Sequence, residues 1–212
     1  MKTTLIYLMT IVMSLNVAHA QQNNYETAMQ KAFELWGQDK PFEAANMFER
    51  IAKAENENWL PHYYVAHINI VYSFGERDKE KLSLQLEKAK QQLEKAKQIS
   101  PDNPEIMVLE ALHNTAWIAY DGATYGMTLS APTSQIYKKA SEIAPDNPRV
   151  VYCKAEWEMG SAKYFGEDTS PFCKDFEKAL TLFDTFKNDT PFYPSWGKDR
   201  AEILLAECNK TE

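Results

Sequence analysis

The chain contains nearly the same nine residues twice, QISPDNPEI at 98–106 and EIAPDNPRV at 142–150. The first proline of each copy ends a preceding helix, because proline disfavours helical backbone just before it. The asparagine is a favoured N-cap residue, and the second proline suits the first helical position, where an N–H has no intrahelical partner. Each copy therefore predicts the end of one helix and the start of the next.

The helix before each turn carries one spaced pattern: a small residue, an apolar residue four later, another three later, and a break five after that. The pattern occurs four times, at spacings of 45, 44 and 46: Ala44, Phe48, Ile51 and Asn56; Ala89, Leu93, Ala96 and Pro101; Thr133, Tyr137, Ala140 and Pro145; Ala179, Phe183, Phe186 and Pro191. Offsets of four and three place the marked side chains on one helix face. Because no segment alternates like a strand, we expect an all-α fold.

The breaks define the expected elements. Helices are predicted near 24–37, 41–55, 60–74, 78–99, 104–120, 131–143, 148–163, 171–188 and 195–209. Taken in pairs, they give four helical hairpins near 24–56, 57–101, 102–145 and 146–191, followed by a capping helix at 195–209.

The spaced pattern resembles the tetratricopeptide repeat, a helix–turn–helix unit that stacks into a right-handed superhelix. The resemblance covers nearly all of the chain after residue 20, and Leu35-Trp36-Gly37 is the part of a first helix that comes nearest to the family's Trp and Leu-Gly signature. The period of 44–46 exceeds the family's typical period of about 34, and HEAT-type repeats of about 40–47 residues are the alternative. The short PDNP connection favours tetratricopeptide-like units.

Residues 1–20, MKTTLIYLMTIVMSLNVAHA, differ in kind from the rest of the chain. Lys2 is their only charge, an apolar run follows, and Ala18-His19-Ala20 has the small residues of a signal-peptidase site. The run is too short and too interrupted by polar residues to span a bilayer core of about 30 Å. We expect a signal peptide cleaved after Ala20 and a periplasmic or secreted protein.

The remaining chain is acidic. Residues 21–212 keep 22 of the 23 basic residues against 30 acidic residues, a formal charge of −8. Nucleic-acid binding requires clustered Lys and Arg, so a nucleic-acid partner is not expected. No second apolar segment approaches transmembrane length, so no membrane insertion is expected after signal cleavage.

Signatures of catalysis are missing from the sequence. It contains no P-loop, dinucleotide fingerprint, HExxH, CxxC or nucleophile elbow. Ser195-Trp196-Gly197-Lys198 fits SxxK, but Ser195 follows a proline at an expected helix start, where serine is an ordinary cap. His62 and His67 miss the i, i+3 or i, i+4 spacing of helical metal ligands. We therefore expect no catalytic residue, no metal site and no cofactor.

The first helices of the second to fourth hairpins carry a recurring polar and aromatic stripe. In the tetratricopeptide family such helices line a concave groove that grips extended peptides. The resemblance thus implies a groove formed by Asn69, Tyr72, Glu110, Asn114, Trp117, Lys154 and Glu158. The alternative is that these side chains satisfy one another along an empty face.

Two stretches look long for hairpin connections: DGATYGMTLS at 121–130 and GSAKYFGEDTS at 160–170. Their aromatic residues and Met127 favour lids folded over the core, and binding loops are the alternative.

Three cysteines follow the expected cleavage point. Cys173 lies 18 residues before the turn near residue 191 and Cys208 lies 17 after it, so antiparallel packing of the last two helices puts them at one level. The sequence allows a Cys173–Cys208 disulfide with Cys153 buried and free, or three reduced, packed thiols.

These features together predict an exported, non-catalytic repeat scaffold that binds a protein or peptide partner in its groove. Two other functions remain open: a helical hydrolase with its active site in the groove, and a carrier of a small apolar ligand.

Overall fold

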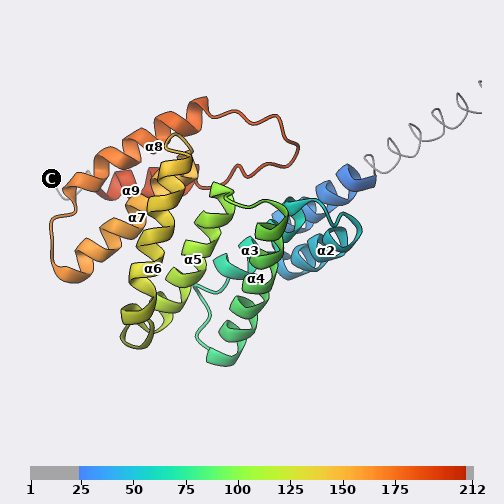
Figure 1. Ribbon diagram of the computed structural model, residues 1–212, viewed down its shortest axis with the longest axis horizontal. Coiled ribbons are helices and arrows are strands. Elements are labelled where there is room, and N and C mark those ends of the chain that lie inside the picture. Colours follow the sequence, from blue (N-terminus) through green and yellow to red (C-terminus); the bar gives the residue numbers. More distant parts are fainter. Residues whose placement is uncertain (1–23, 209–212) are drawn as a thin grey trace, which may run out of the picture.

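A computed structural model describes residues 24–208 and contains only helices and their connections in that range (Figure 1). The expected signal peptide, residues 1–20, lies outside the described residues. Helical residues 24–37 are followed by α2 (Pro41–Ala54), α3 (Trp59–Val71), α4 (Lys79–Ile99), α5 (Pro104–Tyr120), α6 (Gly122–Ile143), α7 (Pro148–Phe165), the 3₁₀ turn η1 (Ser170–Phe172), α8 (Cys173–Thr185) and α9 (Lys198–Cys208). Successive helices form antiparallel hairpins that stack side by side, which confirms the all-α repeat fold.

The two PDNP turns have the structure that their sequence predicts. The side-chain oxygen of Asn103 accepts a hydrogen bond from the backbone N–H of Glu105, and that of Asn147 accepts one from Arg149, both at 2.9 Å. Pro104 and Pro148 are the first residues of α5 and α7. Both turns therefore cap and start the first helix of the next hairpin.

The expected loop at 121–130 is wrong, because this stretch is the first half of α6. The side chain of Asp121 caps the helix by accepting a hydrogen bond from the Thr124 N–H, so α6 begins immediately after α5 ends. The second expected loop is shorter than predicted, since α7 continues to Phe165 before Gly166 adopts the left-handed conformation that ends it.

The apolar side chains of these two stretches do not form lids on the core. Met127, Tyr164 and Phe165 are 93%, 83% and 69% exposed. Tyr164 and Phe165 pack edge to face on each other rather than on the helices below. Tyr125 turns inward and contacts Trp117.

The core consists of two clusters of buried side chains, one among residues 24–37 and α2–α5 and the other among α5–α9. Residues 186–197, which we call the strap, join them. In Figure 1 the strap is the long loop that leaves α8 and returns to α9. Trp196 packs against both clusters and donates a hydrogen bond to the Tyr63 hydroxyl at 2.7 Å. The end of the chain is thereby attached to its beginning.

A buried ion pair links the third and fourth hairpins. Arg149 donates to Glu105 through Nε at 2.7 Å and Nη2 at 2.8 Å, and Asn147 donates to the same carboxylate at 2.6 Å. The side chains of Arg149 and Glu105 are 1% and 0% exposed. All of these donors converge on one carboxylate, so its charge is compensated within the core.

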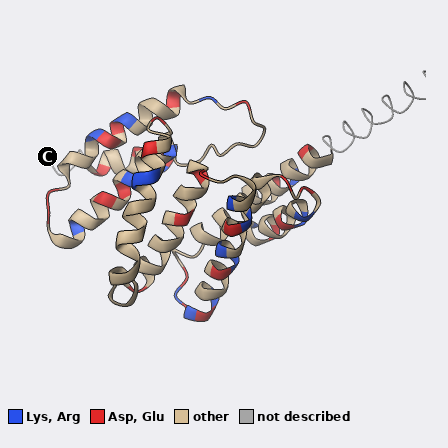
Figure 2. Ribbon diagram, viewed as in Figure 1, with Lys and Arg blue, Asp and Glu red and all other residues tan. Residues whose placement is uncertain are grey.

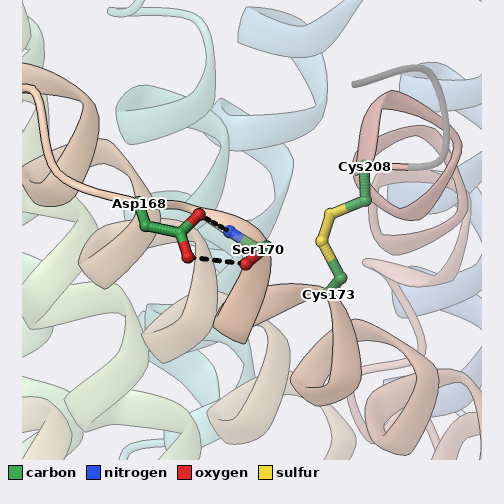
Figure 3. Close-up of a disulfide and its surroundings, with 4 residues drawn as sticks. All are labelled: Asp168, Ser170, Cys173 and Cys208. Atoms are coloured by element: carbon green, nitrogen blue, oxygen red, sulfur yellow. Dashed lines mark hydrogen bonds between the residues drawn. A yellow bond between two sulfur atoms is a disulfide. The ribbon is translucent and has the colours of Figure 1, made fainter. Parts of the chain in front are cut away.

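A disulfide ties the last two helices together (Figure 3). Cys173 begins α8 and Cys208 ends α9, and their Cα atoms lie 5.8 Å apart. This is the pair that the antiparallel packing of these helices favours. Cys153 is free and buried. Across residues 24–208, no helix has the length and apolar character needed to cross a membrane.

Removing one partner of the buried ion pair should destabilise the folded protein. We expect Arg149→Met to lower the free energy of unfolding by about 3–5 kcal/mol, because the Glu105 carboxylate stays buried without its cation. Urea denaturation of the purified protein measures the change. The control is the double variant Glu105→Leu/Arg149→Met, which removes both charges and should recover most of the loss. Equal destabilisation of the single and double variants would show that the uncompensated charge is not the cause.

Thiol labelling should report the disulfide directly. The denatured, unreduced protein should take up one alkyl group, at Cys153, and the reduced protein three, as measured by mass spectrometry. Reduction should also lower the free energy of unfolding by about 2–4 kcal/mol, because the unfolded chain loses a cross-link. Three alkylated thiols without reductant would contradict the bond.

Candidate ligand-binding cleft

A cleft of about 500 Å³ lies between α4 and α6, with α5 as its floor. Figure 1 shows α5 standing between these two second helices of neighbouring hairpins. The cleft is lined by Leu86, Glu87, Lys90, Leu93, Glu94, Glu110, His113, Asn114, Trp117, Tyr125, Thr128, Leu129 and Ile136. Every lining residue belongs to one of these three helices, so packing of the second and third hairpins forms the cleft.

Aromatic and aliphatic side chains form most of its inner surface. The rings of Trp117 and Tyr125 lie 4.9 Å apart between centroids, inclined at 46°. Leu86 and Leu93 of α4 are buried beneath the opening, and Leu129 contributes from α6. Such a surface suits a flat or apolar group that stacks on the rings.

His113 is the one imidazole in the lining, and protein groups already engage it. Its Nε2 lies 3.1 Å from the Leu86 backbone oxygen, and the Asn114 side chain is a second partner. Burial lowers the pKa of His113 below its ordinary value of 6.5, and the positive charge of Lys90 acts in the same direction. The ring is therefore neutral at physiological pH, because burial disfavours its charged form.

Charged side chains surround the opening. Figure 2 shows acidic and basic residues interleaved along α4. Lys97, just outside the lining, donates to Glu110 at 2.7 Å and neutralises that carboxylate. Lys90 is the cation of the lining, with Glu87 and Glu94 one turn to either side on the same helix. An incoming ligand thus meets one lysine among carboxylates before it reaches the aromatic surface.

The cleft brings together three of the seven residues that the resemblance implied for a groove: Glu110, Asn114 and Trp117. All three lie on α5, at successive turns of the helix. They point between the second helices α4 and α6, rather than across a surface made of first helices.

The other four lie elsewhere. Asn69 is 4% exposed and donates its side-chain N–H to the Val65 carbonyl at 2.7 Å. Tyr72 packs against Phe42, with ring centroids 5.9 Å apart. Lys154 and Glu158 pair with each other on α7 at 2.6 Å. The seven residues therefore do not share one groove, because neighbouring helices cover the equivalent position differently in each hairpin.

Sequence reasoning missed the α4 and α6 sides of the cleft. No feature of the α4 sequence pointed to a cleft, and residues 121–130 were expected to form a loop. One signal was present: Tyr125, Thr128, Leu129 and Ile136 are spaced for a single face of a helix. Gly122 and Gly126, which favour turns, outweighed that spacing.

No group of three or more His, Cys, Asp or Glu side chains is arranged to hold a metal ion in residues 24–208.

Comparison with solved structures relates this architecture to a haemophore. The chain is similar to the HusA haemophore from Porphyromonas gingivalis, with 25% sequence identity, a TM-score of 0.76, and 88% of this chain and 92% of that chain covered. It also aligns with a tetratricopeptide-repeat protein of Thermus thermophilus at 13% identity and a TM-score of 0.42, covering 88% of this chain and 99% of that one. No family model matches the sequence, and no curated protein is significantly similar to it. The chain thus shares the all-helical architecture of this haemophore over most of its length.

Proposed function

We propose that this protein is an exported, non-catalytic carrier that holds a flat, apolar ligand of the porphyrin class in the cleft between α4, α5 and α6. The observation that carries the proposal is the aromatic-walled cleft, where Trp117 and Tyr125 meet above buried leucines. The similarity to a haemophore over 88% of the chain supports this choice among apolar ligands.

The dimensions of the cleft suit such a ligand. Small-molecule sites enclose about 300–1,000 Å³ and are lined by aromatic and aliphatic side chains with a few polar groups. The cleft has about 500 Å³, and its aromatic and aliphatic lining includes polar side chains such as His113, Asn114 and Thr128. A porphyrin would place its ring against Trp117 and Tyr125 and keep its carboxylates near Lys90.

The proposal assigns recognition to the porphyrin ring rather than to its iron. His113 is the imidazole of the cleft, and both the Leu86 carbonyl and the Asn114 side chain already contact it. Binding by stacking on aromatic faces needs no metal. We therefore expect haem and metal-free protoporphyrin to bind with similar affinity.

The same contacts argue for binding over hydrolysis. The imidazole of His113 is engaged with a backbone oxygen, and the Glu110 carboxylate is paired with Lys97. General acid–base catalysis needs a side chain within hydrogen-bond reach of a reacting group. Because both side chains are already engaged by protein groups, no observation on this cleft favours the hydrolase alternative.

A second candidate is binding of an extended protein segment. Glu87 and Glu94 give the α4 side of the cleft an acidic character. A basic side chain with an apolar neighbour would complement that arrangement, through charge and through cation–π contact. This candidate predicts that binding weakens steeply with salt, since exposed charges are screened.

Export is part of the proposal. Its support is the signal-like sequence of residues 1–20 and the Cys173–Cys208 disulfide, a bond that persists in oxidising compartments. Fractionation of cells that make the full chain, with N-terminal sequencing of the mature protein, tests it. Recovery of an uncleaved protein from the cytoplasm would contradict export.

The binding experiment titrates residues 21–212 with haem and with protoporphyrin, following the porphyrin absorbance. Trp117→Ala should weaken both affinities by roughly 10- to 100-fold, because it removes a stacking surface. Trp157→Ala is the matched control, since Trp157 lies on α7 outside the cleft and donates to Ser134. Unchanged affinity in Trp117→Ala would exclude the cleft as the site. Binding of basic peptides without any porphyrin binding would favour the second candidate.

A further inference from the structure

We propose that the first half of α6, residues 122–131, is a lid that opens and closes the cleft about two hinges, Asp121 and Pro132. A role of this lid in ligand entry rests on the proposed function, because it requires that a ligand binds in the cleft. The motion itself can be measured without any ligand.

The lid forms most of the α6 side of the cleft. Tyr125, Thr128 and Leu129 line it from this segment, and only Ile136 lines it from beyond Pro132. Movement of residues 122–131 would therefore change the width of the cleft and leave α4 and α5 in place.

The hinge at Pro132 follows from its position inside a helix. Proline has no N–H, so the Thr128 carbonyl lacks its ordinary donor four residues on, and the ring crowds that carbonyl. The Thr133 hydroxyl donates to the neighbouring carbonyl, that of Leu129, at 2.7 Å, and so does not replace the missing bond to Thr128. The helical hydrogen-bond ladder is thus interrupted where the lid meets the rest of α6.

The two halves of α6 are anchored very differently. The fully buried residues of α6 are Thr133, Tyr137 and Ala140, and all three follow Pro132. No residue of the lid is fully buried, and Met127 projects into solvent. Segments with few buried apolar contacts open at a lower free energy than the core does.

The lid sequence is also intrinsically weak as a helix. It contains Gly122 and Gly126, and a Cβ added at either position would meet nothing within 4 Å. Neither glycine has a positive φ, so the backbone geometry does not require them. A glycine inside a helix, such as Gly126, destabilises the helix relative to alanine because it gives up more backbone freedom, and Gly122 at the first position of α6 does so to a smaller extent. Their effect is to lower the stability of the closed lid.

A few contacts hold the lid closed. Asp121 accepts hydrogen bonds from the Thr124 N–H at 3.0 Å and the Thr124 hydroxyl at 2.6 Å. The Tyr125 ring rests on Trp117, and Leu129 faces the cleft. Opening therefore breaks one ring contact and exposes little apolar surface, whereas a flat aromatic ligand would add contacts to the closed state.

Hydrogen exchange on the ligand-free protein tests the motion. Amides of residues 123–131 should exchange at least about 10-fold faster than those of residues 134–143 in the same helix, because local opening requires less free energy there. Equal protection along the whole of α6 would overturn the lid.

A variant pair tests the role of the glycines. Gly122→Ala/Gly126→Ala should slow exchange of the lid amides by roughly 5-fold or more, which corresponds to the about 1 kcal/mol that alanine adds at the interior position Gly126. The control is Gly160→Ala in α7, where an added Cβ likewise meets nothing within 4 Å. That control should leave lid exchange unchanged. Equal lid exchange in the two variants would contradict the inference.

Ligand kinetics separate this inference from the proposed function. With protoporphyrin as the probe, Gly122→Ala/Gly126→Ala should slow dissociation several-fold, and Gly160→Ala should not. Fast exchange of the lid without any porphyrin binding supports the lid and rejects the porphyrin proposal. Porphyrin binding with a uniformly protected α6 supports the porphyrin proposal and rejects the lid.

Discussion

The arrangement of the hairpins depends on the buried ion pair between Glu105 and Arg149. These residues hold the same place in the two copies of the repeated turn, directly after the shared PDNP. The carboxylate of the first copy receives the guanidinium of the second, so the repetition supplies both partners of one contact. A buried charge pair is costly unless each partner is satisfied, and a changed register between α5 and α7 would leave both uncompensated. The pair therefore favours a single stacking of the hairpins.

The same guanidinium also positions the end of the chain. It lies 5.1 Å from the Phe186 ring centroid and 5.7 Å from that of Tyr193, so the strap crosses directly over the ion pair. From there Phe192 receives a hydrogen bond from the Tyr64 hydroxyl, and Trp196 reaches Tyr63. The strap therefore connects the end of α8 to α3, and its contact with Arg149 holds it over the ion pair at the N-terminal end of α5.

Parts of this structure that depend on local chemistry could be predicted from the sequence. Proline and asparagine fixed the helix limits at Pro104 and Pro148, and counting residues along the last two helices placed Cys173 opposite Cys208. The site could not be predicted in the same way. Asn69 and Asn114 occupy equivalent positions in successive hairpins, yet one is buried and the other lines the cleft. This difference in burial depends on how closely the neighbouring second helix packs. The spacing of residues within one helix does not predict that packing.

Residues 121–130, which were expected to form a loop, also have a structure that depends on tertiary packing. Residues 121–130 have the composition of a loop, and they are helical because Asp121 caps them and Tyr125 packs on Trp117. A segment whose intrinsic preference opposes its observed structure depends on its caps and tertiary contacts, so it is released when those contacts break. Here it lies against a floor, α5, that the ion pair and the strap hold fixed. Because α5 is held firmly and the first half of α6 weakly, the cleft can widen for a large flat ligand without disturbing the core. The free energy of opening then comes from the lid alone.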